Sequence, residues 1–216
     1  KFAFPTATAL MIVRWLHCRC RPDPEFPRGI VSSIYYDGRG QPFLNEKINS
    51  DFLKTKVRLR WYADLDTGEP GETSFLEVKR KTGSRRDKFR TPGLFSGRRL
   101  DQIPLESPDL LGIRRVLQTS GIRFEAPIFP ACRITYKRKR FIEPITGARL
   151  CVDWDIGMPR TNPLIVTTAA PVRLDRAVVE VKGSVDELPE VLHQLTTFGC
   201  RREAFSKYML CCMHNA

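Results

Sequence analysis

Lys56-Val57-Arg58-Leu59-Arg60-Trp61-Tyr62 is the stretch of this sequence that decides its fold. Successive side chains of a β-strand point to opposite faces of a sheet, so a strand here places the cations at 56, 58 and 60 on one face. The apolar side chains at 57, 59 and 61 then share the other face, where they predict a buried core. Three like charges at alternate positions repel one another, which favours a fold in which the charged face meets something anionic.

The same alternation of charged and apolar side chains recurs in other segments. A single strand of this kind is explained by an amphipathic sheet with a solvated face, but several with mainly cationic faces indicate a shared basic surface. Curling such a sheet gathers the cations around a central channel and packs the apolar face outward against helices. The charged sets are Glu77, Lys79 and Lys81; Arg149, Cys151, Asp153 and Asp155; and Glu180 with Lys182.

Strands dominate the pattern, with helices near the start, the middle and the end of the chain. Turn signals such as Asp37-Gly38 and Thr146-Gly147 separate several strands and leave no room for helical crossovers, so the sheet is predicted to be antiparallel and the fold class α+β. We treat residues 1–216 as one domain. Strands are expected at 31–36, 56–62, 74–81, 133–141, 149–156 and 177–182. Helices are expected at 6–16 with a cap at Thr6 or Thr8, in pieces within 96–121, from a capping box at 184–187 to about 197, and from about 202 to 212.

The charge balance points to a polyanionic partner. The 216 residues include 36 Lys and Arg against 24 Asp and Glu, a formal net charge of +12. Such an excess suits nucleic acid, an anionic membrane surface or a phosphate chain. No apolar run reaches the ~18 residues that span a bilayer, and no aromatic RNA-binding signature is present. We therefore expect neither a membrane segment in this stretch nor a nucleic-acid partner.

Seven cysteines are present, an odd number without paired C-x-x-C spacing. That pattern predicts free thiols rather than a structural zinc site, and free thiols are typical of the reducing cytoplasm. A cytoplasmic location is the corresponding expectation, with any membrane attachment supplied by parts outside these residues.

Carboxylates among cations suggest phosphate chemistry assisted by a metal ion. Mg²⁺ and Mn²⁺ prefer oxygen ligands, commonly one or two carboxylates together with phosphate oxygens of the substrate. Arginine offers planar forks to phosphate oxygens and lysine offers point charges. Neither a G-x-x-x-x-G-K-[ST] loop nor a kinase-like glycine-rich loop is present. Any phosphate must therefore be held by side chains on strands, and Glu77 and Asp153 become candidate metal ligands.

The ordered set of these segments resembles the VTC domain, the catalytic domain of polyphosphate polymerases and a member of the CYTH-like triphosphate tunnel metalloenzymes. The resemblance is carried by Ser33-Ile34-Tyr35-Tyr36-Asp37, residues 56–62, 75–81, 149–153 and 177–182, Tyr136-Lys137-Arg138 and Phe205-Ser206-Lys207-Tyr208. It implies an eight-stranded antiparallel β-tunnel with flanking helices, with Lys1-Phe2 as the remnant of the first strand.

The resemblance also implies roles for individual residues. By position, Arg58, Arg60, Lys79, Arg138, Arg149 and Lys207 correspond to catalytic basic residues. Lys1, Lys88 and Tyr136 correspond to substrate contacts, to which the alternation adds Lys56 and Lys182. Glu180 corresponds to the metal carboxylate, with Mn²⁺ or Mg²⁺ as cofactor.

Three functions follow as alternatives. The first is an inorganic polyphosphate polymerase that transfers the terminal phosphoryl group of a nucleoside triphosphate to polyphosphate. The second is a triphosphatase with the same basic lining, in which water is the acceptor. The third is a non-catalytic module that binds polyphosphate or another polyanion.

Overall fold

The computed structural model describes residues 1–183 and 189–214, and these form an α+β fold built on one antiparallel sheet. The helical segments are η1 (Thr6–Thr8), α1 (Ala9–Arg19), α2 (Pro42–Ile48), α3 (Gly97–Gln102), η2 (Pro108–Gly112), α4 (Ile113–Thr119), α5 (Glu190–His193), η3 (Gln194–Phe198) and α6 (Lys207–Cys212). The strands are β1 (Phe2–Pro5), β2 (Arg21–Pro22), β3 (Arg28–Asp37), β4 (Leu53–Ala63), β5 (Pro70–Thr82), β6 (Arg85–Pro92), β7 (Phe129–Ile142), β8 (Arg149–Thr161), β9 (Val172–Arg173), β10 (Arg176–Lys182) and β11 (Arg201–Arg202).

The sheet is open rather than closed. Its strand order is β11-β1-β10-β8-β7-β3-β4-β5-β6, with β2 on β7 and β9 on β8, which makes eleven strands in the part of the chain that the structure describes. Within that part, the edge strands β6 and β11 are not paired with each other. The predicted antiparallel α+β fold is confirmed, whereas this pairing does not form the closed eight-stranded tunnel implied by the resemblance.

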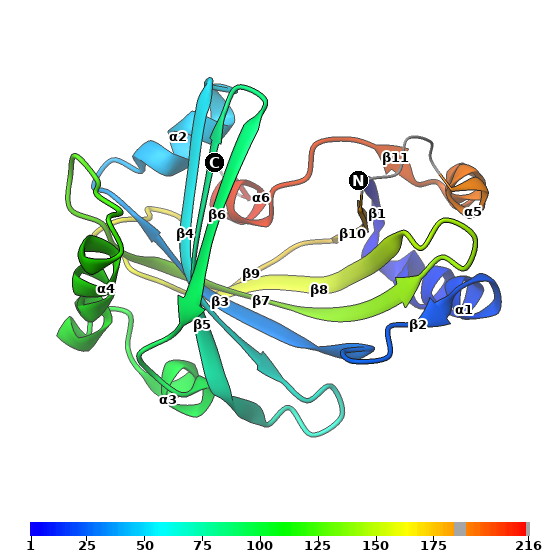
Figure 1. Ribbon diagram of the computed structural model, residues 1–216, viewed down its shortest axis with the longest axis horizontal. Helices are drawn as coiled ribbons and strands as arrows, with labels where there is room; N and C mark the ends of the chain where they lie inside the picture. Colours follow the sequence, from blue (N-terminus) through cyan, green and yellow to red (C-terminus); the bar gives the residue numbers. More distant parts are fainter. Residues whose placement is uncertain (184–188, 215–216) are drawn as a thin grey trace.

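The sheet bends so that its two ends rise on either side of α6. Figure 1 shows β4, β5 and β6 as one wing, β1 and β10 as the other, and α6 between them above β7 and β8. Helices cover the outside of the sheet: α3 and α4 pack behind the first wing and α1 packs behind the second. The inner face of the bend is therefore shared by strands far apart in the sequence.

The alternation at residues 56–62 places its apolar side chains as predicted. Val57, Leu59 and Trp61 are fully buried and pack against Leu100 of α3 and Ile113 of α4. The opposite face of β4 carries the charged side chains, which point into the bend. Burying the apolar face contributes about 2 kcal/mol for each large aliphatic side chain.

Several boundaries differ from the sequence-based expectation. The helix expected at 6–16 begins as a 3₁₀ turn, and the Thr8 hydroxyl donates to the Pro5 carbonyl at 2.8 Å instead of capping α1. Residues 201–202 form β11 on β1, so the last helix begins only at Lys207. The strand Arg85–Pro92 was not predicted. The capping box at 184–187 lies outside the described residues.

One alternation is also interrupted. Asp155 was predicted to share a face with Asp153, but its φ of 53° lies in the left-handed region and the β7–β8 register shifts nearby. Its carboxylate pairs with Lys137 at 3.0 Å and with Arg173, away from the partners of Asp153. Among the described residues, no helix is long and apolar enough to cross a bilayer.

Candidate functional site

The inner face of the bend begins with an ion pair between neighbouring strands. Arg58 on β4 lies opposite Glu77 on β5, and its Nε and Nη2 donate to Glu77 Oε2 at 2.8 and 2.5 Å. Arg58 Nη1 donates to the hydroxyl oxygen of Tyr35 at 3.3 Å. Although burial alone would raise it, the pKa of Glu77 is lowered to about 2 by the charges of Arg58 and Arg60. Glu77 is therefore an anion that fixes two arginines.

Arg60 connects this pair to the middle of the sheet. Its Nε donates to Ser33 Oγ at 3.2 Å and its Nη2 donates to the Tyr136 hydroxyl at 3.3 Å, while Glu77 lies 3.8 Å from its Nη1. The same tyrosine ring lies under Lys207, with the ammonium 4.4 Å from the ring centroid. Tyr136 thus stands between two groups of cations.

A second ion-pair cluster lies on β7, β8 and α6. Arg138 is the register partner of Asp153, and its Nε and Nη2 donate to the two carboxylate oxygens at 2.5 and 2.6 Å. Lys207 Nζ donates to Asp153 Oδ2 at 2.7 Å. Asp153 is completely buried. Burial would raise the pKa of its carboxyl, but Arg138 and Lys207 hold that pKa below its usual value.

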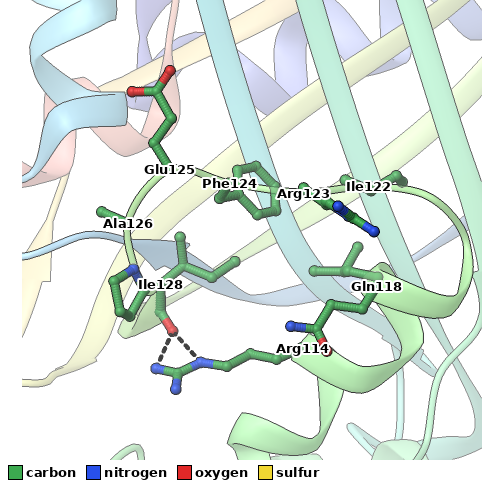
Figure 2. A pocket seen from close by; sticks show the side chains of 10 residues that line it. Arg114, Gln118, Ile122, Arg123, Phe124, Glu125, Ala126 and Ile128 are labelled. Atoms are coloured by element: carbon green, nitrogen blue, oxygen red, sulfur yellow. Dashed lines mark hydrogen bonds between the residues drawn. The ribbon is translucent and has the colours of Figure 1, made fainter.

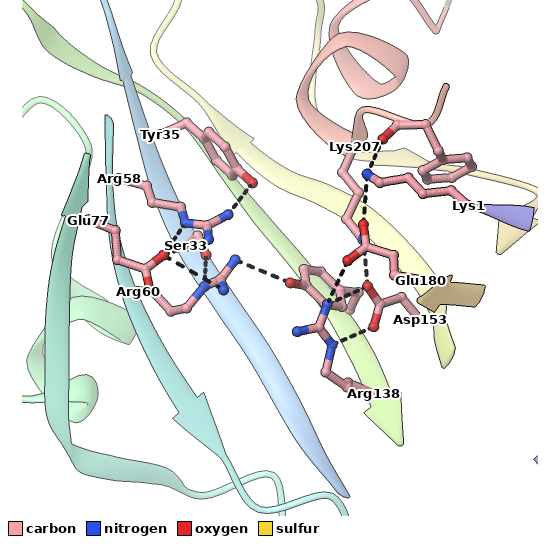
Figure 3. A network of polar contacts seen from close by, with 12 residues as sticks. Lys1, Ser33, Tyr35, Arg58, Arg60, Glu77, Arg138, Asp153, Glu180 and Lys207 are labelled. Atoms are coloured by element: carbon pink, nitrogen blue, oxygen red, sulfur yellow. Dashed lines mark hydrogen bonds and ion pairs between the residues drawn. The ribbon is translucent and has the colours of Figure 1, made fainter. Parts of the chain in front are cut away.

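Lys1 and Glu180 complete the ion-pair network. Lys1 Nζ lies 2.7 Å from Glu180 Oε1 and also donates to the Phe205 carbonyl at 2.7 Å. Glu180 Oε2 is 3.8 Å from Arg138 Nη2. Burial would raise the pKa of Glu180, but Lys207 and Lys1 together hold it well below its usual range. Figure 3 shows these side chains converging from both wings: the cations Lys1, Arg58, Arg60, Arg138 and Lys207 with the carboxylates Glu77, Asp153 and Glu180.

A cavity of about 620 Å³ opens beside the network between β4–β6, α2 and the segment before α6. Asp87 is its acidic lining residue, and that carboxylate pairs with Arg85. The basic side chains that line it are Lys1, Lys47, Lys54, Lys56, Lys79, Arg80, Lys81, Arg86 and Lys88. Lys1 and Arg80 bind protein oxygens. The other seven have no hydrogen bond or ion pair within residues 1–183 and 189–214.

Crowding of these cations changes their acidity. Burial, joined by the charge of Arg58, lowers the pKa of both Lys56 and Lys79 to about 8. Burial and the neighbouring Lys54 also lower the pKa of Lys47. An anion placed in the cavity would relieve this repulsion. The geometry is therefore that of a half-enclosed anion-binding site.

The structure brings together most of the sequence-predicted residues but not all. The ion-pair network or the cavity includes Lys1, Lys56, Arg58, Arg60, Glu77, Lys79, Lys88, Tyr136, Arg138, Asp153, Glu180 and Lys207. Arg149 and Lys182 are exposed and pair in register with each other where β8 begins and β10 ends. Arg149 shares the face of Asp153 but lies four residues along the strand, about 13 Å away. Among the described residues, neither side chain has a hydrogen bond or ion pair with the network.

Several lining residues were not singled out as site residues from the sequence. Lys81 was already in the charged set with Glu77 and Lys79 but was not named as a site residue, and Lys54 continues the spacing of the cations at 56, 58 and 60 by one step. Extending that alternation by two residues would have included Lys54. Lys47 on α2 and Arg86 on the unpredicted β6 carry no such signal, because helix packing and strand pairing bring them to the cavity.

The carboxylates differ in their fitness for a divalent cation. Both oxygens of Asp153 are engaged by cations, which argues against metal ligation by this residue. Glu77 Oε2 accepts two hydrogen bonds from Arg58, and Oε1 lies 3.7 Å from Arg90, but the Glu77 side chain is only 4% exposed. The Glu180 side chain is more exposed, at 16%, and its Oε2 lies 3.8 Å from Arg138 Nη2. No cluster of three or more His, Cys, Asp or Glu suited to a metal occurs in the described residues.

A further cavity of about 530 Å³ lies beside α4, under residues 122–128. Figure 2 shows its lining, in which the Arg114 guanidinium donates from Nε and Nη2 to the Ile128 carbonyl at 3.1 and 2.8 Å. None of the predicted site residues lines this cavity. Its chemistry is unlike that of the basic cavity, because this arginine already binds a protein oxygen.

Comparison with known proteins supports the family resemblance in the first part of the chain. The family model of the VTC domain matches residues 11–96, which confirms the resemblance there. That span includes β3 to β6 and thus Arg58, Arg60, Glu77 and Lys79. No curated protein matches the chain. A solved structure titled "Structure of PH1819 protein from Pyrococcus Horikoshii OT3" is similar, with 12% identity and a TM-score of 0.46 over 97% of this chain and 96% of that one.

Proposed function

We propose that this chain is a metal-dependent phosphotransferase that passes the terminal phosphoryl group of a nucleoside triphosphate to inorganic polyphosphate. The observation that carries the proposal is the basic cavity, where seven cationic side chains have no hydrogen-bonding or ion-pair partner in the described chain. A phosphate chain supplies negative charge at regular intervals and suits such a lining. The match to the VTC domain model supports a function related to polyphosphate.

The basic cavity and the ion-pair network suggest different roles in the reaction. Lysines are point charges on flexible stems, so the cavity residues Lys56, Lys79 and Lys88 are suited to follow a chain of phosphates. Arginine presents a planar fork, and Arg58 and Arg60 are held in place by Glu77. Such preorganised cations stabilise charge that builds up on the phosphoryl oxygens during transfer.

The reaction would break the bond between the terminal phosphorus and its bridging oxygen, leaving a nucleoside diphosphate. A terminal oxygen of polyphosphate would form the new phosphoanhydride bond. Mn²⁺ or Mg²⁺ bound to the triphosphate would neutralise part of its charge, with Glu180 as the protein carboxylate suited to hold it. No protein nucleophile is required, because positioning and charge neutralisation supply the catalysis.

A binding module without catalysis is the second candidate. The observation in its favour is the internal pairing of Arg138 and Lys207 with Asp153, which leaves these cations already compensated. In that case the cavity lysines would hold polyphosphate and the buried network would only stabilise the fold.

Incubation with ATP and Mn²⁺ tests the proposal. We expect polyphosphate, seen as a ladder on a gel, and one molecule of ADP for each phosphate added to the chain. Release of monophosphate without chain growth would identify a triphosphatase instead. Absence of both products, with tight binding of tripolyphosphate, would leave the binding module.

A Glu180→Gln variant provides the matched control. It removes the carboxylate proposed to hold the metal ion and its ion pair with Lys1, but leaves the seven unpaired cavity cations unchanged. We expect it to bind tripolyphosphate and to lose most of the turnover.

A further inference from the structure

Tyr35 stands where the basic cavity meets the ion-pair network. Its side chain lines the cavity, yet the residue is only 4% exposed. The ring stacks on Tyr208 of α6 with centroids 5.2 Å apart and planes 8° from parallel. Arg58 Nη1 donates to its hydroxyl oxygen at 3.3 Å (Figure 3). The ring is thus fixed on one side by a stack, and the oxygen is fixed by a guanidinium.

The hydroxyl of Tyr35 has an unused hydrogen. A phenol has one donor hydrogen and an oxygen that accepts. The oxygen accepts from Arg58, but the hydroxyl hydrogen has no acceptor among the residues that the structure describes. A buried donor without a partner is costly. By contrast, the neighbouring Tyr36 donates its hydroxyl hydrogen to the Leu110 carbonyl at 2.9 Å.

The groups that face Tyr35 are almost all cationic or neutral. From β4 come Lys56, whose ammonium lies 5.7 Å from the ring centroid, and the two guanidiniums of Arg58 and Arg60. From α6 comes Tyr208, whose own hydroxyl donates to Asp37 at 2.9 Å, and from β7 comes the buried thiol of Cys132. Burial alone would raise the pKa of Tyr35, but Arg58, Lys56 and Arg60 lower it to about 8.

We propose that Tyr35 is a further contact residue for the bound anion: held by Arg58, it donates a hydrogen bond to a phosphate oxygen in the cavity and takes up a proton when that anion binds. This inference rests on the proposed function, because it requires an anion in the cavity. In empty sites where Tyr35 is ionised, about half of them at pH 8, the phenolate partly compensates Lys56 and Arg58. An arriving phosphate replaces that negative charge, the phenolate accepts a proton from solvent, and the resulting hydroxyl finds its missing acceptor.

Tyrosine absorbance near 295 nm tests the proton uptake directly, because phenolate absorbs there and phenol does not. In the wild-type protein we expect one tyrosine to ionise near pH 8. Saturating tripolyphosphate should move that ionisation up by roughly one pH unit or more. The ionisation should be missing in Tyr35→Phe and present in Tyr62→Phe, a control on β4 outside the site.

Affinity gives a second readout. Loss of one hydrogen bond to a charged oxygen should weaken tripolyphosphate binding by Tyr35→Phe about tenfold at pH 7, while Tyr62→Phe binds as wild type does. The absorbance readout on wild-type protein stands even if Tyr35→Phe folds poorly.

The possible failures are distinguishable. If tripolyphosphate binds and neutralising Lys56 or Lys79 weakens it, but no tyrosine responds and Tyr35→Phe binds within twofold of wild type, the role of Tyr35 is refuted and the anion site stands. If tripolyphosphate does not bind the wild-type protein, the anion site and the role of Tyr35 are both refuted.

Discussion

Replacing Asp153 by asparagine tests the buried half of the site most severely. The carboxylate is completely buried and binds Arg138 through both oxygens and Lys207 through one. Asparagine has nearly the same shape but no charge, and its amide group presents N–H donors toward two cations. The substitution therefore leaves Arg138 and Lys207 without their closest counter-ion, since Glu180 lies 3.8 Å from Arg138.

The size of the effect follows from burial. Removing one partner of a buried ion pair costs about 3–5 kcal/mol, because the remaining charge stays desolvated and uncompensated. Asp153 serves two cations, so we expect Asp153→Asn to lower the free energy of unfolding by about 4 kcal/mol. With a urea m-value of about 2.5 kcal/mol/M, the unfolding midpoint would fall by about 1.5 M.

Urea unfolding followed by tryptophan fluorescence measures this change. The matched control is Asp66→Asn, which removes an exposed ion pair with Arg28 and should cost less than about 1 kcal/mol. A loss below 1 kcal/mol for Asp153→Asn would refute the reasoning, because it would mean that the two cations do not depend on this carboxylate.

Three further predictions concern the ligand. Calorimetry should show that Lys56→Gln and Lys79→Gln each bind tripolyphosphate about three- to tenfold more weakly than the wild-type protein does. Arg149→Gln should change this affinity less than twofold, because Arg149 is exposed outside the network. Equal losses of affinity in all three variants would contradict the prediction. The affinity for tripolyphosphate should fall between pH 7 and 9, because Lys56 and Lys79 have a pKa of about 8 in the free protein and bind the anion only when protonated. An affinity that rises over this range would contradict the assignment of these lysines to the anion site. Glu180→Gln should retain tripolyphosphate binding within threefold and lose at least 90% of turnover, about the tenfold lower end of the cost of altering residues around a metal site. Full turnover, measured as ADP formed from ATP, would remove Glu180 from the site.

The sequence predicted local features well because strand alternation is a local rule. Val57, Leu59 and Trp61 are buried behind Arg58 and Arg60 as the pattern indicates. Six strands were predicted within the observed limits for the same reason. The strand Arg85–Pro92 was missed because it is mostly charged, with Phe89 its only aromatic residue and no β-branched side chain except Thr91.

What the sequence could not supply were contacts between distant segments. Lys1 meets Glu180 and the Phe205 carbonyl only because β1 pairs with β10 and α6 follows β11. Alternation placed Arg149 on the face of Asp153, but it could not show that the strand carries Arg149 beyond the network. It also could not show that Asp153 would form ion pairs with two cations, since that depends on where α6 places Lys207.

A crystal structure of the protein soaked with tripolyphosphate and Mn²⁺ is the most direct test of the central claim, which is that one half-enclosed basic site holds a chain of phosphates. The prediction is a row of phosphates in the cavity, with oxygens within hydrogen-bond distance of Lys56, Lys79 and Lys88 and one end at Arg58. Density for tripolyphosphate only on the outer surface, for example beside Arg149, with the cavity unchanged would contradict it.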